Sequence, residues 1–596
     1  MLNAALPMMA KRASDTSFGG RLLLRLLLPA FIAILIAAPA RASEASFTPS
    51  VLSDEDRALY RDIFALQEDA RWREADKKIA ALSDTSLIGY VKMERYLHPT
   101  AYRSTYDELK QWMAYYADHP DADRIYALAR RKQPRGATSP LAPIPRKWRA
   151  EPSSPLHPDI AADYARTSKP LLTQIEGRVR FLVRKEQATT ALKEIEQRRA
   201  RGAITERQFD RMRSWIAASF YYQGYVARAE EVAEEIAGRN GDVAVLAYWI
   251  SGLIHFREGD MATAHERFAA MARVEEQDDS LRSAAGFWAA RTALADGHVD
   301  EVSPLLEIAA AYPFTFYGQL ALAQLGRDYD YRWTAPPLDA DGFARLAAAD
   351  PAVKRAVALF EVGRVTEADL EFRWINGRIA DAHAVDLLAL ESRLDLPAAQ
   401  LDLALYHQGK AFEAGLYPVP SYAPANGFTT DRALLYALMR QESKFKVEAT
   451  SRVGARGLMQ LMPRTASYVA KDRTLQRGKG RDKLYDPALN LSIGQDYVNH
   501  LIQTSAEGDL FNMALAYNGG PGNLRRWKRD LAIEDPLLFI ESIPNPESRD
   551  FVEHVLTNFW VYRQRLGQKP QSRDRVAAGE LPLHEALDEI AESPRD

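Results

Sequence analysis

One glutamate stands where it could donate a proton. Glu442 lies at the end of a predicted helix over 432–443, which Asp431 can cap and whose apolar residues fall at helical spacing: Leu434, Leu435, Leu438 and Met439. It therefore projects from the buried stripe at the C-terminal end of the helix. Burial and the negative end of the helix dipole both raise a carboxyl pKa, and a carboxyl still protonated near neutral pH suits cleavage of a glycosidic bond. From the helix alone, an ordinary helix-end glutamate explains Glu442 equally well.

The stretch after Glu442 contains residues suited to binding a sugar. Gly454 and Gly457 permit tight turns, and the missing side chain at Gly457 would let a sugar ring approach the main chain. Gln460 offers both donors and acceptors for hydroxyl and acetamido groups. These residue types predict a carbohydrate cleft beside Glu442.

A second helix could bring polar groups to the same place. Asp509 can cap it and Gly519 can end it, so Tyr517 and Asn518 fall at its C-terminal edge. The following "GGPGN" is unlike a phosphate-binding loop, because it follows a helix rather than a strand and lacks the Lys-Ser/Thr pair.

The long segment before this region reads as almost entirely α-helical. In it a pattern recurs: an aromatic-bearing helix, a glycine, four residues, and then usually an alanine of the next helix. The glycines are Gly224, Gly259, Gly297 and Gly363, and Val302 takes the place of the alanine after Gly297. Glycine at a helix end suits a left-handed C-cap. The first three glycines are separated by 35 and 38 residues, close to the period of about 34 residues of TPR-like repeats. A superhelical scaffold for a long substrate or a partner is expected; an irregular helical bundle is the alternative.

The first 42 residues have the features of a secretory signal peptide. Basic residues precede the apolar run "LLLPAFIAILIAA", which is followed by "ARA" and Ser43, and this run is shorter than the roughly 20 residues of a membrane-spanning helix. Cleavage after Ala42 leaves 72 Lys and Arg against 79 Asp and Glu, a balance that argues against a general nucleic-acid binder. With no cysteine, the chain can form no disulfide.

The scaffold histidines His255, His265 and His298 are not at a convincing ligand spacing, and neither a metal nor a cofactor is expected.

Several ordered blocks carry a resemblance to a known family. "RQESKFKVEATSRVGARGLMQLMPRTA" resembles the catalytic core of the soluble lytic transglycosylases, and it is followed in the family's order by "LYDPALNLSIGQDYV", "MALAYNGGPGNLRRW" and "FIESIPNPESRDFVEHVLTNFWVYR". Upstream, "RYLHPTAYRSTYDELKQWM" and "YPFTFYGQLALAQLG" are similar to the start and end of the family's helical superhelix. The resemblance implies a mainly α fold, a TPR-like superhelix followed by a lysozyme-like domain.

The resemblance also implies a set of site residues. Glu442 would be the catalytic acid/base, and the residues in contact with substrate would be Ser451, Gly457, Met459, Gln460, Met462, Tyr517, Asn518 and Glu547. Taken alone, Ser451 is a plain turn serine and the two methionines are ordinary core residues. The chain departs from the family pattern at Gly519, where alanine is commoner, at Ser548, which replaces threonine, and at the pair Asn545-Pro546. The changes around Glu547 make its contact with substrate or neighbouring side chains less secure.

The resemblance further implies the reaction. A single glutamate, with a pKa tuned toward ~6, protonates the bond between N-acetylmuramic acid and N-acetylglucosamine and then deprotonates the muramoyl C6 hydroxyl, giving a 1,6-anhydro end without water. The 2-acetamido group of the substrate replaces the second carboxylate of ordinary glycosidases. Two alternatives stay open: a hydrolytic muramidase on the same fold, and a helical-repeat adaptor that only binds glycan.

The predicted organisation is a signal peptide over 1–42, a helical scaffold with its linker over 43–425, a lysozyme-like domain over 428–570 and a charged, flexible tail over 571–596. The expected location is the periplasm and the expected partners are peptidoglycan strands, with cell-wall synthesis or division proteins as further candidates. Neither nucleic acid nor a stable membrane span is expected.

Overall fold

The computed structural model describes residues 47–145, 169–275, 277–586 and 588. From Thr48 onward the chain forms one compact unit. The predicted signal peptide lies outside the described residues. Within those residues, no helix has the length and apolar character needed to cross a membrane.

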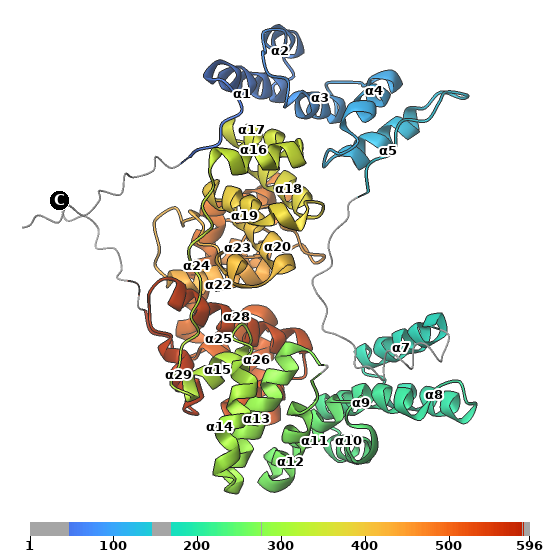
Figure 1. The fold of residues 1–596 in the computed structure, drawn as a ribbon, viewed down its shortest axis with the longest axis vertical. Helices are drawn as coiled ribbons and strands as arrows, with labels where there is room; N and C mark the ends of the chain where they lie inside the picture. The colour runs from blue at the N-terminus through green and yellow to red at the C-terminus, as the bar shows by residue number, and fades with distance from the viewer. Residues whose placement is uncertain (1–46, 146–168, 276, 587, 589–596) are drawn as a thin grey trace, which may run out of the picture. The chain divides into compact units, whose positions relative to one another are not determined.

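The described part of the chain is built from α-helices and short 3₁₀ turns, and its only β-pairing is a few isolated bridges (Figure 1). The predicted mainly α fold class is confirmed. The first group of helices comprises α1 (Asp54–Glu68), α2 (Trp72–Ile79), α3 (Ile88–Leu97), α4 (Tyr106–Tyr116) and α5 (Ala122–Lys132).

The second group forms the stacked hairpins of the scaffold. Each helix packs against the next along the chain: α7 (Lys169–Arg184), α8 (Ala188–Ala200), α9 (Glu206–Tyr222), α10 (Val226–Asn240), α11 (Leu246–Glu258), α12 (Met261–Ala272), α13 (Asp279–Asp296), α14 (Val299–Ala310) and α15 (Phe316–Gln324). A third group follows: α16 (Ala340–Ala349), α17 (Ala352–Glu361), α18 (Val365–Asn376), η1 (Asp381–His383), α19 (Ala384–Arg393), α20 (Pro397–His407), η2 (Lys410–Phe412) and α21 (Glu413–Leu416).

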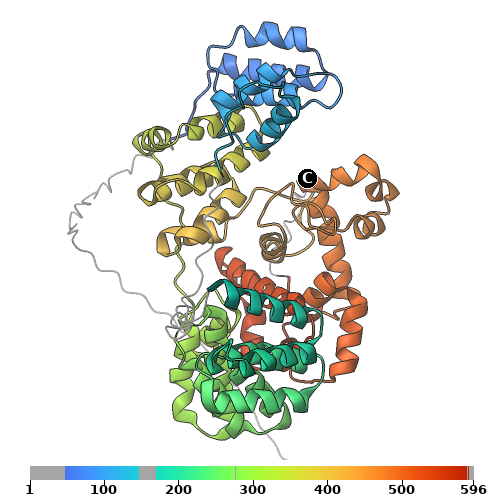
Figure 2. The ribbon, with the colours of Figure 1, turned by 90° about the vertical axis from the view of Figure 1, so that its right-hand side faces the viewer.

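The last group carries the predicted site. It comprises α22 (Arg432–Glu442), α23 (Pro463–Val469), η3 (Arg473–Gln476), η4 (Gly478–Tyr485), α24 (Pro487–Thr504), α25 (Leu510–Gly519), α26 (Pro521–Leu531), α27 (Pro536–Glu541), α28 (Pro546–Arg565) and α29 (Gln571–Ala577). Both α28 and α29, red in the ribbon, contact α15 of the scaffold (Figure 2).

The recurring glycines of the scaffold end helices as predicted. All four have left-handed backbone, with φ of 83° at Gly224, 84° at Gly259, 88° at Gly297 and 86° at Gly363. Three of the small residues that follow are completely buried, at Ala229, Ala264 and Ala368. Glycine turns the chain and alanine lets the next helix approach closely, so the pattern is a packing rule of these hairpins.

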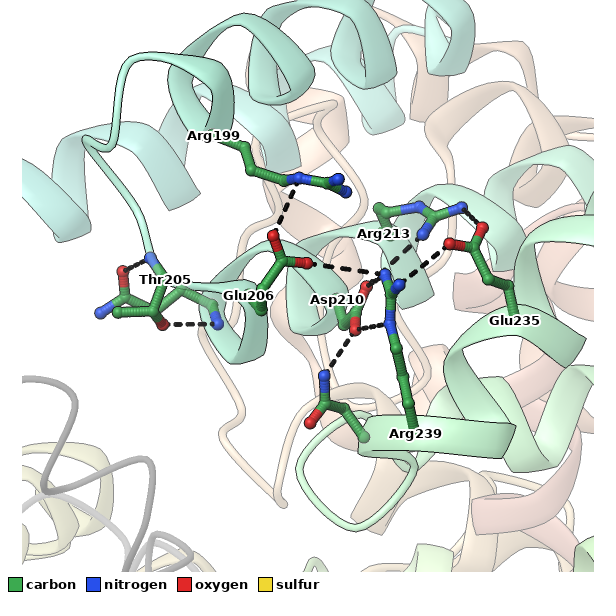
Figure 3. Close-up of polar contacts among 9 residues, drawn as sticks. Arg199, Thr205, Glu206, Asp210, Arg213, Glu235 and Arg239 are labelled. Carbon is green, nitrogen blue, oxygen red and sulfur yellow. Dashed lines mark hydrogen bonds and ion pairs between the residues drawn. The ribbon is translucent and has the colours of Figure 1, made fainter.

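Charged residues connect three scaffold helices (Figure 3). Asp210 of α9 is fully buried and accepts two hydrogen bonds from the guanidinium of Arg239 on α10, at 2.7 and 2.6 Å. Arg239 also pairs with Glu235 at 3.0 Å, and Glu206 reaches Arg199 on α8 at 3.0 Å. Removing one partner of a buried ion pair is strongly destabilising, because it leaves an unpaired charge in the interior. The pair between Asp210 and Arg239 therefore fixes the spacing of α9 and α10.

The hydrophobic core does not divide at the predicted boundary near residue 425. One continuous cluster of buried side chains runs from Ile175 on α7 to Val576 on α29. Phe316 of the scaffold stacks on Trp560 of α28 with ring centroids 5.2 Å apart, and lies 6.1 Å from Phe511 of α25. The scaffold and the lysozyme-like region therefore share a core.

The prediction of a flexible tail is wrong for its first half. Trp560 donates a hydrogen bond to Ser572 Oγ at 3.0 Å, and Arg573 is buried and pairs with Asp328 at 2.8 Å. Leu510 donates its N–H to the carbonyl of Pro582 at 2.9 Å. Residues 571–586 pack on the rest of the chain because their few apolar and hydroxyl groups find matching partners, which charge composition alone does not reveal.

Candidate active site

Helix α22 places Glu442 as the sequence predicts. The Asp431 side chain accepts a hydrogen bond from the N–H of Ala433 at 3.0 Å, which starts the helix. The apolar stripe is completely buried, at Leu434, Leu435, Leu438 and Met439. Glu442 is the last helical residue and is half-buried, at the boundary between this core and the surface.

The pKa of Glu442 is raised to about 8, first by burial of its carboxyl and second by the negative charge of Glu547. The expected value of ~6 is therefore too low. A second acid does act on Glu442, but it comes from a block more than a hundred residues later in the chain. Because the carboxyl keeps its proton near neutral pH, Glu442 can serve as a general acid.

The loop after Glu442 is a tight double turn. Arg456 forms antiparallel bridges with Thr450 and with Leu461. Ser451 Oγ accepts a hydrogen bond from the N–H of Ala455 at 3.0 Å, and Gly454 has a φ of 92°. Ser451 is thus a turn residue that also stays partly exposed.

Gly457 is needed for a different reason from the one predicted. Its φ is 76°, and an added Cβ would lie 2.2 Å from the carbonyl oxygen of Leu484 and 2.4 Å from Asn490 Nδ2. The space beside this buried glycine is therefore filled by the chain itself, rather than left open to a sugar.

Gln460 supports the same turn. It has left-handed backbone, with a φ of 45°, and its amide nitrogen donates to the carbonyls of Ala449 at 3.0 Å and Gly457 at 2.9 Å. The amide nitrogen is thus engaged within the chain, and it is through Oε1 that Gln460 would accept a hydrogen bond from a sugar.

The two methionines differ. Met459 is completely buried and its side chain packs against Gly494, so this side chain is covered by the chain itself. Its backbone matters instead: the carbonyl accepts a hydrogen bond from Tyr517 Oη at 2.7 Å. Met462 is 40% exposed, as a residue lining a cleft must be.

Tyr517 links α25 to the loop. Its ring lies 5.5 Å from that of Tyr497 and is stacked at 6.1 Å on Phe551 of α28. Burial raises the pKa of Tyr517 well above its ordinary value, and the negative charge of Glu442 adds to this. Tyr517 therefore remains a neutral hydroxyl facing the acid.

The end of α25 differs by one residue from the prediction. Gly520, with a φ of 85°, caps the helix, while Gly519 is still helical and its Cβ position lies 2.7 Å from the Trp527 ring. The neighbouring Asn518 accepts a hydrogen bond from Ser548 Oγ at 2.7 Å.

Glu547 stands in the first turn of α28 and is exposed. Asn545 caps this helix by accepting from the N–H of Ser548 at 3.3 Å. Serine in place of the family's threonine thus keeps a hydroxyl that joins α28 to α25, which supports the position of Glu547.

Two positioning residues were not predicted. Asn490, completely buried on α24, accepts from the N–H of Met459 at 2.8 Å and donates to the carbonyls of Arg456 and Leu484. Arg440, two residues before Glu442, donates to Leu416 O at 2.8 Å and to Asn558 Oδ1 at 2.7 Å. Both lie inside the family-like blocks, but only the fold shows what they contact.

Away from this site, His255 lies 3.4 Å from Glu234 and from Asp260. Together with Glu230 and Glu258 it could offer atoms to a cation, contrary to the expectation from spacing. Partly exposed acidic groups of this kind are common without an ion, and we assign this one no role.

Comparisons with known proteins find relatives of the region that carries Glu442 and the loop after it. Residues 421–536 match the model of the transglycosylase SLT domain. The soluble lytic murein transglycosylase of Escherichia coli K12 is 39% identical over 135 residues, which cover 22% of this chain and 21% of that protein. The membrane-bound lytic murein transglycosylase C of Edwardsiella ictaluri is 36% identical over 110 residues, 17% of this chain and 30% of that one. The matched region thus spans about a fifth to a third of these curated relatives.

The fold extends the likeness beyond that region. The 70 kDa soluble lytic transglycosylase of Escherichia coli superposes with a TM-score of 0.56 at 19% identity, covering 88% of this chain and 98% of that one. An inactive mutant of the lytic transglycosylase Slt of Pseudomonas aeruginosa gives 0.51 at 19% identity, covering 86% and 87%. The chain therefore carries a transglycosylase SLT domain at residues 421–536, and its fold is similar to that of the solved soluble lytic transglycosylases.

Proposed function

We propose that the chain is a peptidoglycan lytic transglycosylase that uses Glu442 as its single acid/base. The observation that carries this proposal is the raised pKa of Glu442, to about 8, in a half-buried position where its charge acts on Tyr517, which itself donates a hydrogen bond to the carbonyl of Met459. A group with a pKa near ambient pH is suited both to give and to take a proton.

In the first step, Glu442 gives its proton to the oxygen that joins N-acetylmuramic acid to N-acetylglucosamine. The bond from this oxygen to the muramoyl C1 breaks, and the N-acetylglucosamine part leaves as an alcohol. The 2-acetamido group of the muramoyl residue stabilises the positive charge that develops at C1, so no protein nucleophile is required.

In the second step, the Glu442 carboxylate takes the proton from the muramoyl C6 hydroxyl. Oxygen O6 then bonds to C1, which closes a 1,6-anhydro ring and returns Glu442 to its protonated form. No water enters the reaction. Burial keeps the pKa of Glu442 high, and the charge of Glu547 adds to this.

The residues proposed to contact the glycan are the predicted site residues that are at least partly exposed. They are Ser451, Gln460, Met462, Tyr517, Asn518 and Glu547. Met459 and Gly457 shape the turn from within instead. The proposed location is the periplasm, reached through a cleaved signal peptide, and cell-wall synthesis or division proteins are the proposed protein partners.

Product analysis with purified peptidoglycan tests the reaction. The mature protein should release muropeptides that are lighter by one water than hydrolysis products, as read by mass spectrometry. Glu442→Gln should lower the release about 10³-fold or more, since it removes the proton for both steps. Glu448→Gln, an exposed glutamate six residues later, is the matched control and should keep full activity.

The alternatives give different products. Reducing ends at full mass would identify a hydrolytic muramidase. Glycan binding without any cleavage, equal in the natural protein and Glu442→Gln, would identify a non-catalytic adaptor and overturn the proposal.

A further inference from the structure

Three scaffold tyrosines contact the short segment that leads into α28. Tyr221 and Tyr222 end α9, and Tyr317 stands at the start of α15, in the "YPFTFYGQLALAQLG" block. The segment 541–549 joins α27 to the first turn of α28 and carries Glu547. Residues far apart in the sequence therefore meet next to a group that acts on Glu442.

Each tyrosine contacts a different residue of segment 541–549. Tyr221 and Ser542 share a buried hydrogen bond of 2.8 Å between their hydroxyl groups. The Arg549 guanidinium lies over the Tyr222 ring, 3.6 Å from its centroid, in cation–π geometry. The Tyr317 hydroxyl donates a hydrogen bond to Glu541, in a fully buried position.

The scaffold also contacts the other end of α27. Asp535 caps this helix by accepting from the N–H of Leu538 at 2.9 Å, and it pairs with Arg291 of α13. Contacts at both ends of a six-residue helix leave it little freedom to shift. The start of segment 541–549 is therefore set by the scaffold.

Below the tyrosines lies a pair of carboxyl groups. Glu541 and Glu553 are hydrogen-bonded to each other, and burial raises the pKa of both. A pair that retains a proton attracts rather than repels, so it ties segment 541–549 to the second turn of α28. Arg549 and Asp550 are the other charged groups that act on this pair.

We propose that Tyr221, Tyr222 and Tyr317 are positioning residues that hold Glu547 where its charge acts on Glu442. The proposal rests on the proposed function, because it assigns to the scaffold a part in tuning the acid of that reaction. Glu547 is exposed on a helix that begins at Pro546, so its place depends on how the preceding segment is held.

The proposal predicts in which direction the Glu442 pKa shifts when these contacts are lost. Glu547 of α28 raises the pKa of Glu442, and Tyr517 of α25, whose own pKa is raised by burial and by Glu442, stays neutral. If segment 541–549 loosens, the Glu547 charge moves away and the Glu442 pKa falls. Because the first step needs protonated Glu442, the alkaline limb of the pH–rate profile then moves to lower pH.

The experiment is a double-mutant cycle on the full mature chain. Tyr317→Phe and Tyr221→Phe each remove one hydroxyl, and Glu547→Gln removes the charge. Each single variant should move the alkaline limb of kcat/KM to lower pH, by about half a unit for Glu547→Gln. The double variants should move it no further than Glu547→Gln alone, because the tyrosines act through that charge.

Tyr60→Phe is the matched control. It also removes a buried tyrosine hydroxyl, which donates to Asp84 O at 2.8 Å on the N-terminal helices, and it should leave the limb in place. A Tyr317→Phe variant that loses activity equally at every pH, with an unmoved limb, would overturn the proposal. So would shifts that add to that of Glu547→Gln.

A direct NMR measurement of the Glu442 pKa separates this inference from the proposed reaction. The carboxyl carbon of Glu442, in protein labelled with ¹³C-glutamate and assigned with Glu442→Gln, reports its pKa without turnover. A lower Glu442 pKa in Tyr317→Phe supports the positioning role even if no anhydro product forms; an unchanged pKa refutes it even if the product does form.

Discussion

Glu442 keeps its proton for two separable reasons. Burial of the carboxyl is the larger cause, and the charge of Glu547 is the smaller. The burial of the carboxyl depends on α22, which the local sequence specifies. The effect of the Glu547 charge depends on the packing of α28 against α22. A group tuned in this way makes the folded chain less stable than it would be with a neutral residue.

Replacing Glu442 by glutamine should therefore stabilise the protein at high pH. The folded state holds the Glu442 proton up to about pH 8 and the unfolded state only to its ordinary value of 4.5. The free energy of unfolding thus falls as pH rises through this window. Glu442→Gln should gain about 2 kcal/mol at pH 8.5 and almost nothing at pH 4, as measured by urea unfolding. Glu534→Gln, an exposed control, should show no such difference; an equal gain at both pH values would contradict this account.

Two glycines of the active-site loop should respond differently to alanine. Gly454 has a φ of 92° but open space around its Cβ position, so Gly454→Ala should cost about 1 kcal/mol. Gly457→Ala adds a clash with the Leu484 carbonyl, and should cost about 3 kcal/mol or more and abolish activity. Denaturant unfolding measures the free energy of unfolding of both variants. Equal losses would show that backbone strain alone destabilises them and that the clash at Gly457 does not.

At this scale the sequence predicts residue types better than their roles. The sequence singles out Glu442 and the loop glycines because general acid chemistry and turn geometry need these residue types. The burial of Met459 and the closed space beside Gly457 depend on Gly494, Leu484 and Asn490, which lie on other segments. No local pattern contains that information.

Helix ends are the elements that local sequence determines most completely. Asp431 and Asp509 cap α22 and α25 as predicted, because a short acidic side chain reaches the free N–H groups of its own helix. The structure caps α25 one residue later than predicted, at Gly520 instead of Gly519. Either of two adjacent glycines can end a helix, and Trp527 packs against the first of them.

The scaffold glycines allow a matched test of this rule. Gly259 has a φ of 84° with nothing near its Cβ position, whereas Gly238 lies exposed inside α10. Gly259→Ala should lower the free energy of unfolding by about 1 kcal/mol, and Gly238→Ala should raise it by up to about 1 kcal/mol. Thermal unfolding of both variants measures the difference, and a loss at Gly238 would show an unexpected role for that glycine.

The folded chain has one hydrophobic core that crosses the domain boundary predicted from the sequence. The proline-rich stretch near residue 420 predicted a domain boundary, yet buried side chains continue across it from α15 to α25 and α28. Composition reveals a linker, but it cannot reveal whether the segments that it joins share a core. The packed residues after 570 escaped prediction for the same reason.

The predicted domain should accordingly fold poorly when it is separated. A chain of residues 428–570 would expose Trp560 and Phe511, which Phe316 contacts in the full protein, and would lose Ser572 as partner of the Trp560 N–H. We expect aggregation or rapid chymotrypsin digestion of this piece, with the full mature chain resistant. A monomeric piece with cooperative unfolding would show that the shared core is dispensable.

The buried ion pair between Asp431 and Arg563, 2.6 Å apart, has a consequence for catalysis. Asp431 begins α22 and Arg563 lies near the end of α28, so the pair joins the two helices about 16 Å along α22 from Glu442 and about 24 Å along α28 from Glu547. A stiff helix transmits a shift along its axis with little loss. The separation of the two acids can therefore be altered by substitutions at Asp431 or Arg563, more than ten residues along each helix from Glu442 and Glu547, which would change the acidity of Glu442 without replacing either acid.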